Sequence, residues 1–349
     1  MPEKQDIREL SKKEIEMYLT SIGEKTFRAT QIWDWLWKKV VFSFDEMTDL
    51  SKSVREKLNE HFYIKSIPVE TKIVSKDRSQ KFTFLLDDGN RVEGVLIPSH
   101  ERFTACISTQ VGCPMGCRFC STATMGFIRN LTFTEIFFQV YWLNKTALEG
   151  NGTGLSNIVI MGMGEPLMNY ESVIAAIDRI TAGFEMSPKR ITLSTIGIPA
   201  MIRKLADDNV RINLAVSLHA ASDEKRTKLI PYNKKASVDQ LNEVLKYYCN
   251  ATGEKITLEY VLLRDVNDTL QDAKDLVKFC STLNCKVNLI EYNAGDDETF
   301  QKASPENADF FKNFLEKKRI IVNLRKSRGE DIFGACGQLA NKISKSESL

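Results

Sequence analysis

Residues 103–120 read FTACISTQVGCPMGCRFC, a strand-like run followed directly by a Gly- and Pro-containing loop with three cysteines. The first part, 103–109, has the composition of a buried strand. From this point the chain alternates strand-like and helical segments. The further strands are expected at 157–161, 190–194, 212–218, 257–263 and 286–291.

This alternation predicts the fold class. Helical segments such as 134–148 and 270–283 separate the strands, and a further strand-like run at 320–324 follows a helix near 305–317. Six strand–helix units indicate an α/β fold with a parallel sheet, and they are too few for a closed eight-stranded barrel. We therefore expect a curved, partly open (β/α)6 TIM-like barrel with its chemistry at the carboxyl ends of the strands.

The first 60 or so residues predict three short helices. Ser11 and Ser51 are placed to cap the first and the third, and the segment 27–40 carries apolar residues at helical spacing. Trp35 lies off that apolar face. Two interpretations stay open for it: a ring that stacks on a base, or a half-buried packing residue.

Between these helices and the barrel, residues 69–98 change to the alternating pattern of strands, and Asp88-Gly89 marks a hairpin. This change of period suggests three units. They are a helical domain at 1–65, a β-hairpin extension at 66–98 that joins the barrel, and the barrel itself at 99–349.

Composition excludes several classes of protein. The 349 residues include 48 Lys and Arg against 46 Asp and Glu, a net charge of +2, which argues against a polycationic nucleic-acid coat. With 43% hydrophobic residues the chain is not disordered by composition. No apolar run approaches the roughly 20 residues of a membrane span, and the start MPEKQDIREL has no secretory pattern. We expect a cytoplasmic protein with reduced cysteines, and a tight cysteine cluster then indicates metal or redox chemistry.

The cluster Cys113, Cys117 and Cys120 places three thiols within eight residues of one loop. Such a loop can wrap a soft metal centre without help from distant parts of the chain. Three ligands leave one position open, which favours catalysis, whereas structural zinc sites fill all four positions. The alternative is structural zinc with a fourth ligand from elsewhere.

Other polar residues follow the predicted strands. MGMGEP, residues 161–166, closes the second strand, where glycines let backbone approach a ligand and Glu165 can accept hydrogen bonds from an amine. Ser194 closes the third strand, and Ser217 and His219 close the fourth. We expect these side chains at the same rim as the cysteines.

The cysteine spacing, with an aromatic residue before the last cysteine, resembles the radical S-adenosylmethionine (SAM) signature. More specifically, the chain resembles the RlmN-type dual-specificity RNA methyltransferases over almost its whole length. The matching motifs include GEKTFRATQIWDWLWKK, RVEGVLIP, MGMGEPLMNY, LSTIG, VSLHA, EYN and GEDIFGACGQL. The family methylates carbon 2 of an adenine in 23S ribosomal RNA and of the adenine next to the anticodon in some tRNAs.

The resemblance implies a set of roles. Cys336 matches the cysteine that one SAM methylates, and a second SAM, bound to a 4Fe–4S cluster on Cys113, Cys117 and Cys120, yields the 5′-deoxyadenosyl radical. Cys106 matches the cysteine that forms a transient disulfide with it, and Glu93 matches the proton acceptor. The positions that match SAM contacts are Gly164, Glu165, Ser194, Ser217, Leu218, His219 and Asn293.

The resemblance also implies an RNA-binding N-terminal domain, a flavodoxin-type electron donor and two SAM molecules per turnover; we expect a monomer. LSTIG has Ile196 where a Ser is common, which puts one side-chain contact in question. Two basic runs could hold phosphates: one from Lys225 and Arg226 to Lys235, and one at 325–328. A solvated charged face is the alternative for both.

Two alternatives to this function stay open. The sister activity methylates carbon 8 of the same adenine and confers antibiotic resistance; Pro166 resembles the carbon-2 group, since the resistance enzymes carry Ala there. A non-catalytic zinc or iron–sulfur RNA-binding module is the other. It predicts a closed fourth ligand, no SAM cleavage and indifference to Cys336→Ala.

Overall fold

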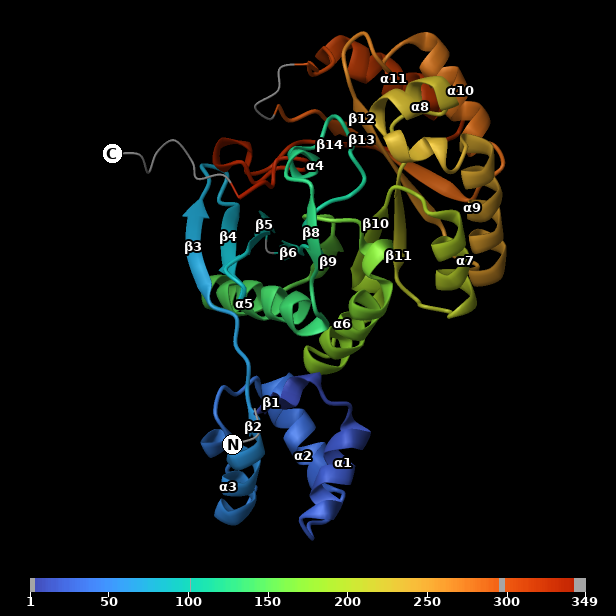
Figure 1. The fold of residues 1–349 in the computed structure, drawn as a ribbon. Helices are drawn as coiled ribbons and strands as arrows, with labels where there is room; N and C mark the ends of the chain where they lie inside the picture. The colour runs from blue at the N-terminus through green and yellow to red at the C-terminus, as the bar shows by residue number, and fades with distance from the viewer. Residues whose placement is uncertain (1–3, 101, 295–298, 342–349) are drawn as a thin grey trace.

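The computed structural model describes residues 4–100, 102–294 and 299–341. Figure 1 shows a small helical unit below a larger α/β body, and the chain passes between them in the segment that leads to β3. The helical unit contains three α-helices and a short parallel strand pair. These are β1 (Gln5–Asp6), α1 (Lys12–Ser21), α2 (Arg28–Asp34), α3 (Lys52–His61) and β2 (Phe62–Tyr63).

The predicted caps of this unit are confirmed. The side chain of Ser11 accepts a hydrogen bond at the start of α1, and Ser51 does so at the start of α3. The helix expected over 27–40 changes character, because α2 ends at Asp34 and a π-helical turn, Trp35–Lys39, follows. Trp35 is half-buried, and its Nε1 donates to Asp49 Oδ1 at 2.6 Å. The packing interpretation of this ring therefore fits the structure.

Ten strands form one sheet in the order β14-β13-β12-β11-β10-β9-β6-β5-β4-β3. Neighbours from β6 to β14 are parallel, and β3, β4 and β5 add an antiparallel edge next to β6. The strands are β3 (Val69–Val74), β4 (Gln80–Leu85), β5 (Arg91–Ser99), β6 (Arg102–Cys106), β9 (Asn157–Ile160), β10 (Ile191–Thr195), β11 (Asn213–Ser217), β12 (Ile256–Leu262), β13 (Cys285–Glu291) and β14 (Val322–Arg325).

The predicted open barrel is confirmed, with one addition. The run expected at 320–324 forms β14, a seventh parallel strand that pairs with β13 through Val287 and Val322. Within the described residues β14 and β3 are the two edges of the sheet and do not pair, so the barrel stays open. The hairpin at Asp88-Gly89 joins β4 to β5, and Gly89 has the positive φ, 79°, that this turn requires.

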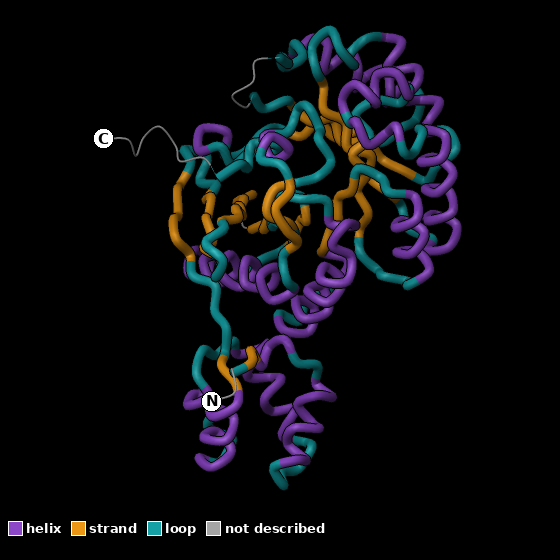
Figure 2. Tube along the Cα trace, in the orientation of Figure 1, coloured by secondary structure: helices purple, strands orange, loops and turns teal. Residues whose placement is uncertain are grey.

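Helices cover the outer face of the parallel strands, as Figure 2 shows in purple. Their apolar faces pack on the sheet, which leaves the inner face for the site. They are α5 (Phe133–Asn151), α6 (Tyr170–Gly183), α7 (Pro199–Asp207), α8 (Asp223–Leu229), α9 (Val238–Thr252), α10 (Leu270–Cys280) and α11 (Pro305–Lys317). Among the described helices, none combines the length and apolar character that a membrane crossing requires.

A small antiparallel pair, β7 (Gln110–Gly112) and β8 (Phe127–Asn130), encloses the cysteine loop and a short helix, α4 (Ser121–Thr124). The pattern of the sequence did not predict it, because strands of three and four residues carry too little periodicity. Gly112 has φ +73°, and a Cβ on it would lie 1.8 Å from the carbonyl oxygen of Gly126. Glycine is therefore required where β7 delivers Cys113.

The helical unit packs against α5 and α6 through aromatic side chains. Trp37 is 1% exposed and meets Phe137 edge-on at 4.9 Å between ring centroids. The backbone of Trp37 comes so close to Gly183 that a Cβ there would lie 2.3 Å from the Trp37 carbonyl oxygen. The buried guanidinium of Arg8 donates to Val41 O at 2.8 Å and lies 4.9 Å from the centroid of the Phe138 ring.

Candidate functional site

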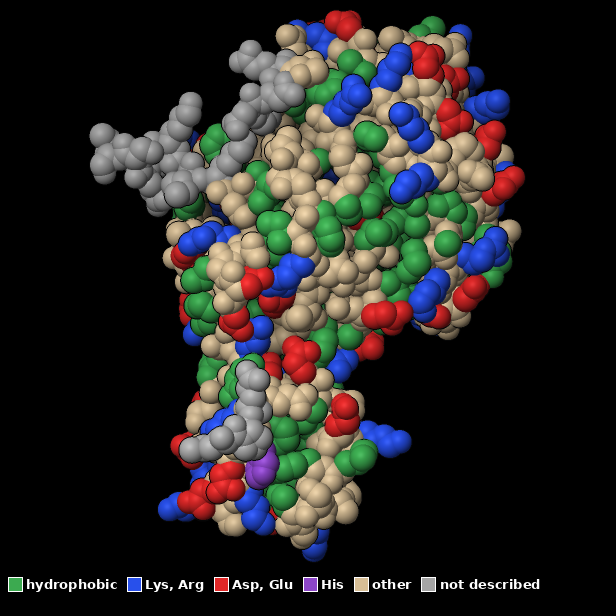
Figure 3. All heavy atoms as spheres, viewed as in Figure 1, with side chains coloured by type: hydrophobic (Ala, Val, Ile, Leu, Met, Phe, Trp, Pro, Cys, Tyr) green, Lys and Arg blue, Asp and Glu red, His purple; other side chains and the backbone are tan. Residues whose placement is uncertain are grey.

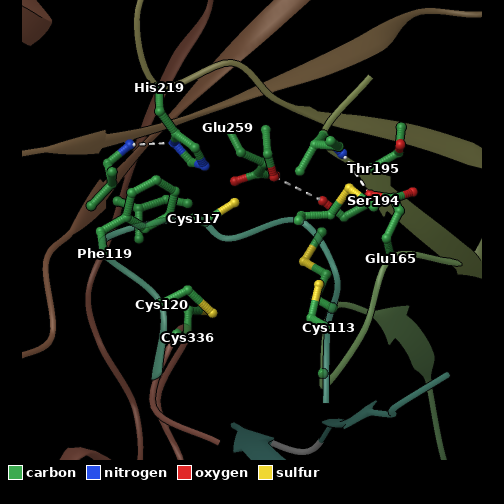
Figure 4. A pocket seen from close by; sticks show the side chains of 18 of the residues that line it. Cys113, Cys117, Phe119, Cys120, Glu165, Ser194, Thr195, His219, Glu259 and Cys336 are labelled. Atoms are coloured by element: carbon green, nitrogen blue, oxygen red, sulfur yellow. Dashed lines mark hydrogen bonds between the residues drawn. The ribbon is translucent and has the colours of Figure 1, made fainter. Parts of the chain in front are cut away.

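A cavity of about 160 Å³ lies at the carboxyl ends of the parallel strands, inside the barrel mouth. In Figure 3 green hydrophobic side chains and tan atoms, which are backbone and uncharged polar side chains, occupy most of the centre of the upper body, and charged side chains of both signs lie around it. Figure 4 shows the cavity from close by. Its lining includes all three clustered cysteines and, from the expected SAM contacts, Gly164, Glu165, Ser194, Ser217, His219 and Asn293.

The loop after β7 holds the three cysteines at separate points of the cavity wall (Figure 4). The Cys113 amide donates to Gly126 O at 2.8 Å, and the Cys120 amide donates to Cys117 O at 3.2 Å. Burial raises the pKa of Cys113 to about 12 and that of Cys117 well above its usual value. Thiolates at these positions therefore need a cation to stabilise them.

The spread of the thiols bears on the kind of centre they hold. Among the described residues, no group of three or more His, Cys, Asp or Glu side chains converges as a single ion requires. A 4Fe–4S cluster does not need such convergence, because each cysteine binds a different iron. The three thiols around one cavity thus fit a cluster better than the structural zinc that was the alternative.

The turn after β9 presents Gly164 and Glu165 to the cavity. Gly164 has φ +104°, and a Cβ on it would lie 2.6 Å from Gln110 Cβ, so only glycine fits this approach. Glu165 is 2% exposed and accepts from the amides of Leu167 (3.0 Å) and Ile196 (2.9 Å). Burial raises its pKa to about 7, against these hydrogen bonds. A cationic amine at this carboxylate would favour its charged form.

The next strands supply hydroxyls and an imidazole. Ser194 Oγ and Ser217 Oγ lie 3.5 Å apart at the ends of β10 and β11. His219 is buried, and its Nδ1 accepts from the Val261 amide at 3.0 Å. Burial, and then the charge of Arg226, lower the His219 pKa to about 3. The ring is therefore neutral with its proton on Nε2, which makes it a hydrogen-bond donor rather than an acid.

Leu218 and Ile196 differ in how they relate to the cavity. Leu218 is fully buried and does not line it; its backbone amide donates to Glu259 O at 3.0 Å. Ile196, where a Ser was expected, does line it, so the substitution removes a hydroxyl from the wall. Glu259 itself lines the cavity as a buried carboxylate that the motifs did not single out. The signal available in the sequence was one acidic residue within the apolar strand ITLEYVLL.

A second cavity of about 120 Å³ adjoins the first and brings the two predicted reactive cysteines together. Cys106, at the end of β6, and Cys336, in the C-terminal loop, both line it, together with Cys120, which lines both cavities. Arg325 also lines both. Cys336 has an exposed side chain, whereas Cys106 is buried. Burial raises the pKa of Cys106 to about 12.

The loop that carries Cys336 is fastened on both sides. Asn293 Nδ2 donates to Cys336 O at 3.2 Å, and the Ser121 amide donates to Gly337 O at 2.7 Å. Thr122 Oγ1 donates to Leu339 O at 2.6 Å. These bonds tie the C-terminal loop to the cysteine loop, so Cys336 is fixed beside Cys120.

Glu93 lies outside both cavities. It is 1% exposed on β5, and its Oε1 forms a 2.9 Å ion pair with the buried Lys81. Its Oε2 accepts from the amides of Ala340 and Asn341 at 3.0 and 3.1 Å. Glu93 thus anchors the end of the C-terminal loop in this structure. Its expected role as a proton acceptor remains a prediction, and it requires this segment to move.

Arg226 takes neither of the two roles left open for the first basic run, a phosphate contact or a place on a solvated face. Its guanidinium is fully buried and donates to Leu218 O at 3.1 Å and to Asn233 Oδ1 at 2.7 Å. Neighbouring Lys225 pairs with Asp272 at 2.8 Å. A run of basic residues in the sequence does not indicate which of their side chains are buried. In the second run, Arg325, Lys326 and Arg328 line the cavity that holds Cys336.

Comparison with known proteins agrees with this geometry. The family model described as ribosomal RNA large subunit methyltransferase N-terminal domain matches residues 5–64, and the radical SAM superfamily model matches residues 107–280. A probable dual-specificity RNA methyltransferase RlmN from Christiangramia forsetii is 48% identical over 341 residues, 97% of each chain. Its counterpart from Flavobacterium psychrophilum is 49% identical over 342 residues, 97% of this chain and 99% of its own.

The chain belongs to the RlmN family of radical SAM RNA methyltransferases. A radical SAM methyltransferase from Sphaerobacter thermophilus has the same fold, with a TM-score of 0.91 and 36% identity over 97% of this chain and all of that one. Membership of the RlmN family implies SAM and a 4Fe–4S cluster. The open set of three thiols and the glycine cradle at Gly164 fit these groups, and so does Asn293 Oδ1, which is buried without a hydrogen-bond partner in the described part of the chain.

Proposed function

We propose that this enzyme methylates carbon 2 of an adenine in 23S ribosomal RNA, at the peptidyl-transferase centre, and of the adenine next to the anticodon in some tRNAs. The observation that carries the proposal is the shared cavity of Cys336 and Cys106 next to the pocket with the three clustered thiols. Carbon 2 of adenine lies between two ring nitrogens and is electron-poor, so it does not attack a methyl donor as a nucleophile. A radical route is needed.

When bound, SAM and the cluster on Cys113, Cys117 and Cys120 supply a methyl group and an organic radical. The chain contributes an acceptor for the methyl group: Cys336, whose side chain is open to the cavity. Glu165 orients the amine of SAM, and Ser194, Ser217, His219 and Asn293 line the wall against which the rest of the molecule lies. Two SAM molecules per turnover, one for each task, follow from this division.

Release of the product requires a second thiol. Cys106 lies in the same cavity and stays protonated because of its high pKa. We assign it the attack on the sulfur of Cys336. The S–S bond forms, the bond between that sulfur and the carbon attached to the base breaks, and this carbon takes a proton to become the methyl group; Arg325 would favour the attacking thiolate. Glu93 is proposed to take the proton from the base once the C-terminal loop has moved.

A flavodoxin-type protein is the proposed electron donor, and the helical domain at 1–65 is proposed to bind RNA.

The test is the mass of the peptide that contains Cys336, from protein loaded with iron and sulfide and incubated with SAM. One added methyl group on Cys336 is expected. An unmodified Cys336 in protein that retains its cluster contradicts the mechanism. It would leave a radical SAM enzyme with another route.

The sister carbon-8 activity is the second candidate, and Pro166 is the feature that favours carbon 2. It occupies the first position of the short helix after Glu165, where its ring is buried. The methylated nucleoside from treated RNA, identified by mass spectrometry against both standards, separates the two activities. The non-catalytic module requires that Cys336→Ala changes nothing in that assay.

A further inference from the structure

A band of polar side chains crosses the inner face of the barrel beside the cysteine loop. The ladder between β11 and β12 sets Ser217 opposite Glu259, and the ladder between β12 and β13 sets Glu259 opposite Asn288. Ser194 reaches the same band from β10. Figure 4 shows Glu259 and Ser194 on the same side of the cavity, with Cys117 below Glu259.

Only one of the two carboxylate oxygens of Glu259 accepts a hydrogen bond among the described residues. Its Oε1 accepts from Asn288 Nδ2 at 2.8 Å. Its Oε2 is buried and has no hydrogen-bond partner among the described residues. Arg325 Nη1 lies 3.8 Å away, which is too far for a hydrogen bond although the charges attract. A buried carboxylate oxygen that faces a cavity and lacks a donor is costly unless a ligand supplies the donor.

The polar side chains of this band limit which ligand groups can donate the missing hydrogen bond to Glu259. An ionised carboxylate oxygen only accepts, while the Ser194 and Ser217 hydroxyls both donate and accept. A vicinal diol matches this set, since each of its hydroxyls can donate to one group and accept from another. SAM carries one such diol, the 2′- and 3′-hydroxyls of its ribose. Its amine is already assigned to Glu165, at the end of β9.

We propose that Glu259 Oε2 accepts a hydrogen bond from a ribose hydroxyl of SAM, which makes Glu259 a cofactor-positioning residue. The inference rests on the proposed SAM site. It adds one residue on β12 that fixes the sugar. Burial raises the pKa of Glu259, and the charge of Arg325, 3.8 Å away, acts against that shift in favour of the carboxylate.

The experiment measures binding, not turnover. The full chain, with its cluster reconstituted and kept anaerobic without a reductant, is dialysed to equilibrium against SAM, 2′-deoxy-SAM and 3′-deoxy-SAM. At least one deoxy analogue is expected to bind the wild-type protein about tenfold or more weaker than SAM, as the loss of a hydrogen bond to a charged group predicts. Glu259→Gln should bind SAM weaker by a similar factor and should no longer distinguish SAM from that analogue.

Glu291→Gln is the matched control, because Glu291 borders the same cavity but is paired with Lys302 at 2.9 Å. It should keep the wild-type discrimination. Equal discrimination in wild type and Glu259→Gln, or its loss in Glu291→Gln as well, overturns the proposal. Absence of discrimination in the wild-type protein overturns it too, even if Glu259→Gln fails to fold. Methylation of Cys336 is measured separately. It distinguishes a failure of this inference from a failure of the proposed function.

Discussion

Cys106 and Cys336 line one cavity but differ in solvent exposure. Cys336 is exposed to the cavity, whereas Cys106 is almost fully enclosed at the end of β6. Desolvation disfavours a thiolate, so the raised pKa of Cys106 follows from its place in the barrel wall. Burial also raises the pKa of Cys336, and the guanidinium of Arg325 acts in the opposite direction on both thiols. The pair therefore combines an accessible acceptor with an enclosed thiol that stays protonated at neutral pH.

Alkylation should reveal this difference. In protein prepared without iron, iodoacetamide at pH 8 should label Cys336 and leave Cys106 largely unlabelled. A pKa of about 12 instead of 9 leaves Cys106 with about a thousandfold less thiolate at that pH. Between pH 8 and pH 10 its labelling rate should rise about a hundredfold, because thiolate grows tenfold per pH unit below the pKa. Peptide mass spectrometry gives both rates, and equal labelling of the two cysteines at pH 8 contradicts the assignment.

The buried guanidinium of Arg226 donates hydrogen bonds to the backbone that follows β10 and β11. Removing its buried side chain by Arg226→Ala leaves the Leu218 and Ile196 carbonyls without their donor. We expect a loss of about 3–5 kcal/mol in the free energy of unfolding, measured by urea denaturation. Lys228→Ala, which removes an exposed charge paired one helical turn away with Glu224, is the control and should change the stability little. A small effect of Arg226→Ala would show that the guanidinium is dispensable.

The sequence predicted those site residues whose type and whose position after a strand both indicate a function. The three cysteines, Glu165 and Ser217 were located by motif and by their place after strands, and the cavity contains them. Arg226 was misjudged because a basic residue in a basic run gives no sign of burial. Glu259 was missed because a single acid in an apolar strand resembles a solvated edge residue until its neighbours are known.

The β7–β8 pair is the element that sets the geometry of the cysteine loop. The loop begins directly after Gly112, and the Cys113 amide is held by Gly126 O. Short strands of this kind form through tertiary contacts and leave almost no pattern in the sequence. The larger strands were foreseen to within about two residues, except that β6 ends at Cys106 and not at residue 109.

Two glycines in this pair offer a matched test. Gly112→Ala places a Cβ 1.8 Å from the Gly126 carbonyl oxygen, so the hairpin must open. Gly126→Ala meets nothing within 4 Å, although φ is also positive there, at +70°. Iron content and the visible absorption of the reconstituted cluster should fall severalfold in Gly112→Ala and stay near wild type in Gly126→Ala. Equal losses in the two variants would mean that backbone conformation alone, and not the close approach, matters.

The two units of the molecule are joined by aromatic packing, to which Lys65 adds an ion pair with Asp87 at 3.0 Å. Trp37, Phe137 and Arg8 join the helical unit to α5 and α6 over a buried aromatic surface. A buried apolar interface of this kind restricts the motion of the helical unit relative to the barrel. An RNA that binds both units would then meet them in a narrow range of orientations.

Trp37→Ala should weaken this junction. The variant removes a fully buried aromatic side chain and leaves a cavity, a change worth about 3–5 kcal/mol. Unfolding followed by tryptophan fluorescence and by far-UV circular dichroism should separate into two transitions, whereas the two wild-type curves are expected to coincide. Coincident curves in the variant would show that the two units unfold together without this contact.

The fastening of the C-terminal loop to the cysteine loop also bears on biosynthesis. Thr122 and Leu339 are hydrogen-bonded although 217 positions separate them in the chain. A ribosome therefore makes the cysteine loop long before the segment that closes over it. The last strand of the sheet, β14, ends at Arg325, a short segment before Cys336. The contact between the two loops therefore forms only after the whole barrel has been synthesised.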